Sequence, residues 1–181
     1  YYGSKIENSD IQGIYDVGMV FNADSYPAFG LQTMGEKAIA ATQPDGNMSL
    51  DLKIEQVKQY PTKDGEVTEI LLKDKVYPFE IKQYYKAYQG TDIISTWIEI
   101  MNNGKKSVTL YRFVSAYLPV QRGDNWLTHF HGHWGAENML EEEKLTNGQK
   151  VISNKDGMVN TETDNPSFML SIDGKPQEEY G

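Results

Sequence analysis

All three histidines of the chain lie at alternate positions of one short segment, as His129, His131 and His133. Alternate residues of a β-strand point to the same face, so this spacing places three imidazoles side by side. Three imidazoles can form a His₃ zinc site whose open fourth position activates water. Against this, Gly132 weakens a strand, the chain has no cysteine, and strand histidines often only hydrogen-bond their neighbours. We therefore predict no stoichiometric metal and no cofactor.

Carboxylates are plentiful, but their positions do not define a catalytic pair. A glycosidase that retains configuration needs two carboxyl groups about 5 to 5.5 Å apart across the scissile bond. The 26 Asp and Glu residues occur mostly in turns or at alternating strand positions, as solvated charges do. The sequence also has no G-x-S-x-G elbow for a serine nucleophile, no G-x-G-x-x-G and no phosphate loop. We predict no catalytic residue in this chain.

The elements that must position these side chains have the period-2 alternation of β-strands. Met48, Leu50, Leu52 and Ile54 alternate with polar residues, which predicts a strand with one buried face. The same pattern runs from 77 to 87, after Pro78 has set an extended start. Across 93–100 and 108–117 both alternating sets are apolar or aromatic. These two strands are expected to be covered on both faces in the middle of a sandwich.

Turn signals separate these runs at intervals of roughly ten to fifteen residues, which favours consecutive antiparallel strands. The only helical-looking segment, 136–145, is rich in glutamate and is interpreted as a solvated acidic face or loop. We therefore predict an all-β, antiparallel β-sandwich that forms a single domain over residues 1–181. The turn signals are Asp45-Gly46-Asn47, Asp64-Gly65, Gly90-Thr91-Asp92, Asn102-Asn103-Gly104, Asn147-Gly148, Asp156-Gly157 and Asp173-Gly174.

Composition restricts the class of partner. A net charge of −9 with scattered lysines repels phosphate backbones, which argues against nucleic acid. No apolar run approaches the roughly 20 residues of a membrane helix, so no membrane partner is expected and the chain should be soluble. The absence of cysteine does not decide between cytoplasm and periplasm. Twelve Tyr and three Trp suit the binding of a neutral sugar, but they also suit a sandwich core or a subunit interface.

Four stretches of the sequence, in the same order and spacing, resemble the N-terminal domain of glycoside hydrolase family 36, the bacterial α-galactosidases. The third stretch is similar to the Gly-x-Trp-x-x-Glu segment of that family. The stretches include Tyr26-Pro27-Ala28-Phe29-Gly30 with Asp45-Gly46, Leu71-Leu72-Lys73-Asp74 with Asn102-Asn103-Gly104, Gly132-His133-Trp134-Gly135-Ala136-Glu137, and Asn165-Pro166-Ser167-Phe168.

The resemblance implies a β-supersandwich that precedes a (β/α)₈ barrel, with the two catalytic aspartates on that barrel beyond Gly181. The chain is then expected to be truncated at both ends of the sandwich, with some strand edges unpaired. It would be a non-catalytic domain, inactive alone, that shapes the α-galactoside pocket and the oligomer interface of a retaining α-galactosidase. Its partners would be the sugar, for example a raffinose-type oligosaccharide, its own downstream barrel and further copies of the enzyme.

One substrate-binding residue follows from the resemblance, because the family's Trp of Gly-x-Trp-x-x-Glu reaches the sugar pocket. Here that residue is Trp134, and the alternative is a Trp134 buried in the core. Ala136 stands where the family usually has Arg, and the segment before Asn165 lacks the family's His. The three-histidine cluster is not a family feature. The family's early acidic pocket residue has no secure match, and Asp16 is the nearest candidate.

Two other functions remain open at this point. The first is a free-standing carbohydrate-binding module, which needs a complete sugar site within the chain. The second is a small metal-dependent, cupin-like hydrolase built on the three histidines. An open reading frame that continues for several hundred residues with an alternating β/α pattern would separate both from the α-galactosidase domain.

Overall fold

The computed structural model describes residues 26–30, 36–118, 120, 124–154 and 164–172. Every regular element in these residues is a β-strand, and every strand pairing is antiparallel apart from one isolated bridge between Ala28 and Ile39. The chain divides into two compact units, one formed by Ile11–Pro119 and the other by Tyr1–Asp10 with Val120–Gly181. Each unit is described by itself below.

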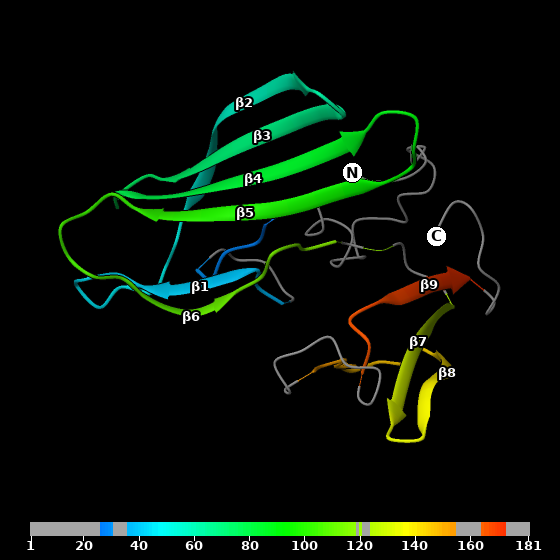
Figure 1. Ribbon diagram of the computed structural model, residues 1–181. Coiled ribbons are helices and arrows are strands. Elements are labelled where there is room, and N and C mark those ends of the chain that lie inside the picture. The colour runs from blue at the N-terminus through cyan, green and yellow to red at the C-terminus, as the bar shows by residue number, and fades with distance from the viewer. Residues whose placement is uncertain (1–25, 31–35, 119, 121–123, 155–163, 173–181) are drawn as a thin grey trace, which may run out of the picture. The chain divides into compact units, whose positions relative to one another are not determined.

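The larger sheet of the Ile11–Pro119 unit is a four-stranded meander in the order β2-β3-β4-β5, visible in Figure 1 as the green and teal arrows. Tight turns connect its strands, and the signals Asp64-Gly65 and Gly90-Thr91-Asp92 predict two of them. The turn between β3 and β4, at 75–78, carries no such signal. Gly65 begins β3, and a Cβ atom there would stand 2.0 Å from the carbonyl oxygen of Ala87, so only glycine allows β3 and β4 to approach this closely. The strands are β2 (Leu52–Thr62), β3 (Gly65–Asp74), β4 (Phe79–Tyr88) and β5 (Ile94–Asn102).

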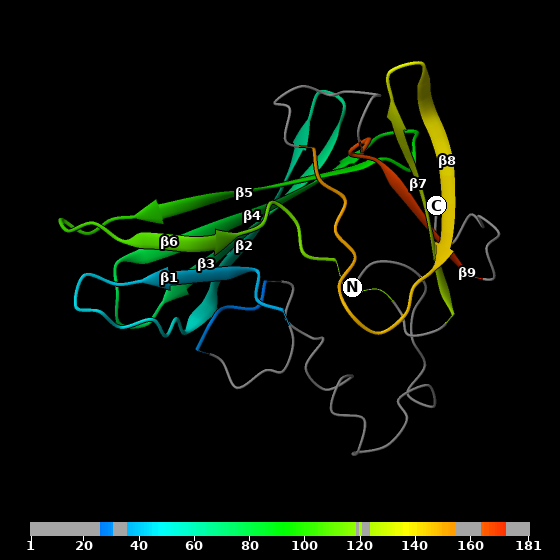
Figure 2. The same cartoon turned by 90° about the horizontal axis from the view of Figure 1, so that it is seen from below.

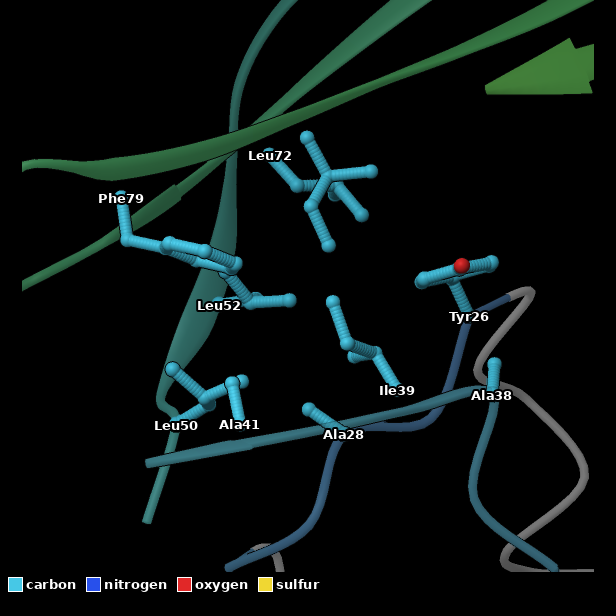
Figure 3. Packing of buried hydrophobic residues seen from close by; sticks show 10 residues of the cluster. Tyr26, Ala28, Ala38, Ile39, Ala41, Leu50, Leu52, Leu72 and Phe79 are labelled. Atoms are coloured by element: carbon cyan, nitrogen blue, oxygen red, sulfur yellow. The ribbon is translucent and has the colours of Figure 1, made fainter. Parts of the chain in front are cut away.

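A two-stranded sheet of β1 (Ile39–Thr42) and β6 (Thr109–Phe113) forms the second layer of this unit (Figure 2). Ile39 points from β1 toward the side chains that the larger sheet contributes, among them Leu72 and Phe79 (Figure 3). Tyr26 closes one side of this core and donates a hydrogen bond from its hydroxyl to the carbonyl oxygen of Val114, at 2.8 Å. Burial of the phenol raises its pKa above the usual value. The core therefore lies between the two sheets of a sandwich.

The alternation from 77 to 87 is confirmed over Phe79, Ile81 and Gln83, which are all buried. It is not confirmed beyond them, because Tyr84 is buried and Ala87 is exposed. The alternation around Leu50 is confirmed only in its middle. Leu50 and Leu52 are buried, whereas Met48 and Ile54 are exposed. β2 begins at Leu52, and its register with β3 shifts between Ile54 and Gln56. The rest of this edge strand runs beyond the part of the sheet that β1 and β6 cover.

The expectation that 93–100 and 108–117 form central strands covered on both faces is wrong. β5 is the edge strand of its sheet, and Ile94 is 56 % exposed. All five residues of β6 are exposed, including Tyr111 and Phe113. The physical reason is that, within the part of the chain that the structure describes, the second layer has two short strands, so it covers one end of the four-stranded sheet. Apolar residues beyond that end are left on the surface of the described chain.

The second unit contains a three-stranded sheet in the order β8-β7-β9. β7 (Asn125–His133) lies between β8 (Ala136–Lys144) and β9 (Phe168–Ile172). The acidic segment 136–145 is thus a strand, neither a helix nor a loop. Its solvated acidic character is confirmed, because most side chains of β8 are exposed or half-buried. Pairing with β7 outweighs the low strand propensity of glutamate.

The all-β sandwich predicted from the sequence is confirmed. The single domain over residues 1–181 stays a prediction. Among the described residues, no helix is long and apolar enough to cross a membrane.

Candidate functional site

The β7–β8 hairpin carries all of the chemically distinctive residues of the sequence. His133 pairs with Ala136, so Trp134 and Gly135 form a two-residue turn between the strands. Gly135 has a φ of +81°, which a side chain would strain. A positive φ at the second central residue is the arrangement of a type II turn. The turn therefore requires glycine at 135 and leaves position 134 free for a large side chain.

A β-bulge in β8 lies directly next to this turn. His131 pairs with Met139 and His133 pairs with Ala136, so Gly132 stands opposite both Glu137 and Asn138. Asn138 adopts a φ of +54°, which asparagine tolerates better than most residues. Bulges increase local twist and re-aim neighbouring side chains. Here the bulge also shifts the register of β8 by one residue relative to β7. The shift determines which side chains of β8 lie on the same face as the histidines.

Trp134 is 83 % exposed at the tip of the hairpin. This exposure contradicts the alternative in which the indole is part of the core. An exposed indole on a tight turn offers a flat apolar face with one N–H donor, which suits contact with a sugar ring. Its role as a substrate-binding residue stays a prediction.

The three histidines do not converge as a His₃ site. The rings of His129 and His131 lie 6.2 Å apart between centroids, and no group of possible metal ligands among the described residues contains His133. His129 lies in the middle of the sheet and is only 3 % exposed, whereas His131 is half-buried and His133 is exposed. The three imidazoles thus differ in burial along β7, and of the three only His129 belongs to a group of possible metal ligands among the described residues.

The structure brings two glutamates of β8 to the buried histidine instead. Nε2 of His129 is 3.7 Å from an Oε2 of Glu141 and 4.0 Å from an Oε1 of Glu143. Nε2 of His131 is 3.5 Å from the same Glu141 oxygen. Lys150 forms an ion pair with Glu143, and that carboxylate raises the pKa of the lysine. The sequence analysis did not identify either glutamate.

Other residues singled out in the sequence lie elsewhere. Asp16 and the segment 155–163, which includes Asn160, are outside the described residues. Asn165 is next to the hairpin, because its N–H donates a hydrogen bond to the carbonyl oxygen of Phe130 at 3.0 Å. Its side-chain oxygen accepts hydrogen bonds from the N–H and hydroxyl of Ser167. The Asn-Pro segment therefore forms the entry to β9.

The comparisons with known proteins agree with this fold. The family model described as "Glycosyl hydrolase family 36 N-terminal domain" matches residues 1–181. The chain is 24 % identical over 174 residues to the α-galactosidase AgaA of Geobacillus stearothermophilus. The aligned region covers 86 % of this chain and 24 % of the relative. The chain thus spans about a quarter of the length of that curated relative.

Solved structures show the same fold. The crystal structure of the GH36 α-galactosidase AgaA from Geobacillus stearothermophilus superposes with a TM-score of 0.77 at 22 % identity, over 96 % of this chain and 28 % of that one. A substituted form of that enzyme, solved in complex with raffinose, gives a TM-score of 0.75 at 24 % identity, over 83 % of this chain and 23 % of that one.

Proposed function

The chain belongs to the family of glycosyl hydrolase family 36 N-terminal domains, and from this membership we propose that it shapes the sugar pocket of an α-galactosidase through Trp134. In this proposal the domain supplies no catalytic group. It supplies the indole at the tip of the β7–β8 hairpin, which contacts the apolar face of a galactose ring. The observation that carries the proposal is the 83 % exposure of Trp134.

The local structure supports a binding role because it fixes where the indole stands. An exposed indole does not stabilise the fold, whereas its burial would contribute roughly 1.5 to 3 kcal/mol to the free energy of folding. The antiparallel pair of His133 with Ala136 closes the turn, and the positive φ of Gly135 fixes the backbone at its tip. A preorganised platform loses less entropy on binding than a side chain on a long loop.

The charge of the chain supports a neutral sugar as ligand. The net charge of −9 disfavours anionic substrates, whereas galactosides carry no charge. One relative of the fold was solved with raffinose, which is an α-galactoside of this kind. We therefore propose raffinose-type oligosaccharides as the substrate class and the barrel of the same polypeptide as the catalytic partner.

We also propose that exposed apolar residues of β5 and β6 contribute to an interface in the complete enzyme, with the barrel or with another copy. Ile94, Tyr111 and Phe113 are exposed in the described chain, and they belong to strands whose two faces are both apolar. Apolar surface of this kind usually marks a contact site.

The test is Trp134→Ala in the complete polypeptide that carries this chain. We expect kcat/KM for raffinose to fall by the equivalent of about 1 to 3 kcal/mol, because an aromatic platform is lost, with little change in melting temperature. The matched control is Trp126→Phe, on β7 of the same hairpin but away from the turn, which should leave kcat/KM unchanged. A collapsed melting temperature with normal kinetics in the surviving folded enzyme would end the sugar-platform assignment.

A free-standing carbohydrate-binding module makes a different prediction for the same residue. In that case the chain alone would bind galactose or raffinose, and Trp134→Ala would abolish the binding. Isothermal titration of the isolated chain with raffinose separates the two functions. We expect no binding, because a single exposed indole does not bury 70 to 90 % of a ligand as small-molecule sites do.

A further inference from the structure

In place of the expectation from the sequence that the chain holds no stoichiometric metal, we propose that His129, Glu141 and Glu143 form a divalent transition-metal site that joins β7 to β8. One donor atom from each of these residues lies within 4.8 Å of the other two. Zinc accepts imidazole nitrogen and carboxylate oxygen as ligands. The three residues come from two adjacent strands, so a bound ion would fix the register of the hairpin that presents Trp134. The observations behind this site do not depend on the proposed sugar-binding function.

The buried imidazole is the observation that points to a ligand. His129 is 3 % exposed, and neither of its ring nitrogens has a hydrogen-bond partner. Buried polar groups in proteins are nearly always hydrogen-bonded, and an exception calls for an explanation such as an ion. The nearest carboxylate oxygen, on Glu141, is 3.7 Å from Nε2, which is too long for a hydrogen bond. An ion between them would satisfy the nitrogen and both carboxylates.

The spacing fits a small cation after a modest closure. Two donors on one tetrahedral zinc are about 3.3 Å apart, because zinc binds nitrogen and oxygen at roughly 2.0 to 2.2 Å. The distances from Nε2 of His129 to the two glutamates are 3.7 and 4.0 Å. Rotation about the glutamate side-chain bonds is sufficient to close such gaps, since both glutamates are only half-buried.

Two neighbouring residues complete the arrangement. His131 lies 3.5 Å from the Glu141 oxygen, where it can hold that carboxylate in position as an outer-shell partner does. Lys150 is the counter-ion of Glu143 in the described structure. Its ammonium would compete with a metal for this carboxylate. An imidazole among the ligands favours zinc over calcium or magnesium, which prefer sites made only of oxygen.

The experiment uses the purified protein, produced without a histidine tag, and zinc itself as the probe. We expect about one zinc per chain by elemental analysis after dialysis, and a Kd measured against a chromogenic chelator. Glu141→Gln and Glu143→Gln each keep the side-chain volume and should weaken zinc binding at least tenfold. Lys150→Gln should strengthen it, because the competing ammonium is gone. Circular dichroism confirms that each variant is folded.

Two matched variants distinguish the site from adventitious binding. Glu142 is on the same strand but faces the other side of the sheet, where it accepts a hydrogen bond from Thr128. Glu142→Gln and His133→Gln should both leave zinc affinity unchanged. Absence of stoichiometric zinc in the unsubstituted protein would overturn the proposal. So would an equal loss of affinity in Glu142→Gln, or loss of binding in His133→Gln, since the exposed histidine would then be the ligand.

Discussion

Charged side chains on the face of the four-stranded sheet that lies away from the core pair across neighbouring strands. Lys82 lies 3.7 Å from Glu69 and Lys73 lies 3.5 Å from Glu80. The closest pair is Lys86 of β4 with Asp64 of the β2–β3 turn, at 2.6 Å. The Lys86 ammonium holds the pKa of Asp64 below its usual value, and a hydrogen bond from Thr62 acts in the same direction.

This lowered pKa predicts a pH-dependent effect of Asp64→Asn. A carboxyl group whose pKa is depressed by folding stabilises the protein above its unfolded pKa, and this stabilisation is lost as the pH falls through the folded pKa. The raised pKa of Lys86 keeps its own contribution present throughout the neutral range. Asp64→Asn should therefore lower the urea midpoint at pH 7 and lower it by less near pH 2, because the stabilisation is lost as the pH falls through the folded pKa of the carboxyl group.

The control is Asp92→Asn, in the turn between β4 and β5, because Asp92 makes no ion pair among the described residues. Its urea midpoint should match that of the unsubstituted chain at both pH values. An equal loss in both variants at pH 7 would mean that net charge, not the pair with Lys86, causes the effect. A surface pair of this kind contributes little in absolute terms, so the comparison depends on matched measurements.

At the scale of single residues, Trp134 could be predicted and the His129 cluster could not. The glycines on both sides of Trp134 favour a position near the surface, which is what its exposure shows, although the sequence analysis did not predict the turn itself. The cluster depends on the bulge. Without the bulge, the pairing of His133 with Ala136 would place Leu140 opposite His129. The extra residue at Asn138 moves Glu141 to that position instead. A one-residue shift exchanges the two faces of a strand, and no spacing in the sequence reveals it.

Within the elements, burial is concentrated in short stretches, so neighbouring residues of similar type should differ sharply in their contribution to stability. Ile81 of β4 is 0 % exposed and stands between Leu72 and Ile100 on the adjacent strands. Ile81→Ala should lower the free energy of unfolding by about 2 to 5 kcal/mol, because it leaves a cavity in the sandwich core. Urea unfolding of the purified variant measures this loss.

The matched variant is Ile54→Ala on β2, where the same side chain is 66 % exposed. Its free energy of unfolding should stay within about 0.5 kcal/mol of the unsubstituted value. Similar losses at the two positions would contradict the assignment of the core to the end of the sheet that β1 and β6 cover.

The strands differ in how far alternation predicts them. β4 follows the rule from Phe79 to Gln83, where one face is covered and the other is half-buried, and departs from it at Tyr84, which is buried on the second face. The prediction fails for β5 and β6, because apolar side chains in a sequence do not show whether another layer covers them. In the described sandwich the second layer is narrower than the first, so these side chains are exposed. β8 has the composition of a solvated helix or loop, and only its partner strand makes it extended. Turns are the most predictable elements, because they depend on local residues alone.

At the scale of the whole molecule, the role that we propose for the chain is that of a support. Glycoside hydrolysis with retention requires two carboxyl groups about 5 to 5.5 Å apart with access to the sugar. Glu141 and Glu143, which lie close together on β8, face a buried imidazole and the Lys150 ammonium. They are therefore engaged within the sheet, and the resemblance assigns the catalytic aspartates to a barrel.

The final prediction concerns the activity of the chain by itself. The purified 181-residue chain should not hydrolyse a chromogenic α-galactoside above the rate of buffer, because in our proposal it contributes a sugar-binding indole and not the acid and nucleophile that cleave the bond. The measurement is release of nitrophenol at high protein concentration, with the complete polypeptide as the positive control. The variant Glu141→Gln, Glu143→Gln serves as a second control. Turnover that survives every purification step and disappears in this double variant would show that the β7–β8 hairpin is itself catalytic, and the domain would then be an enzyme.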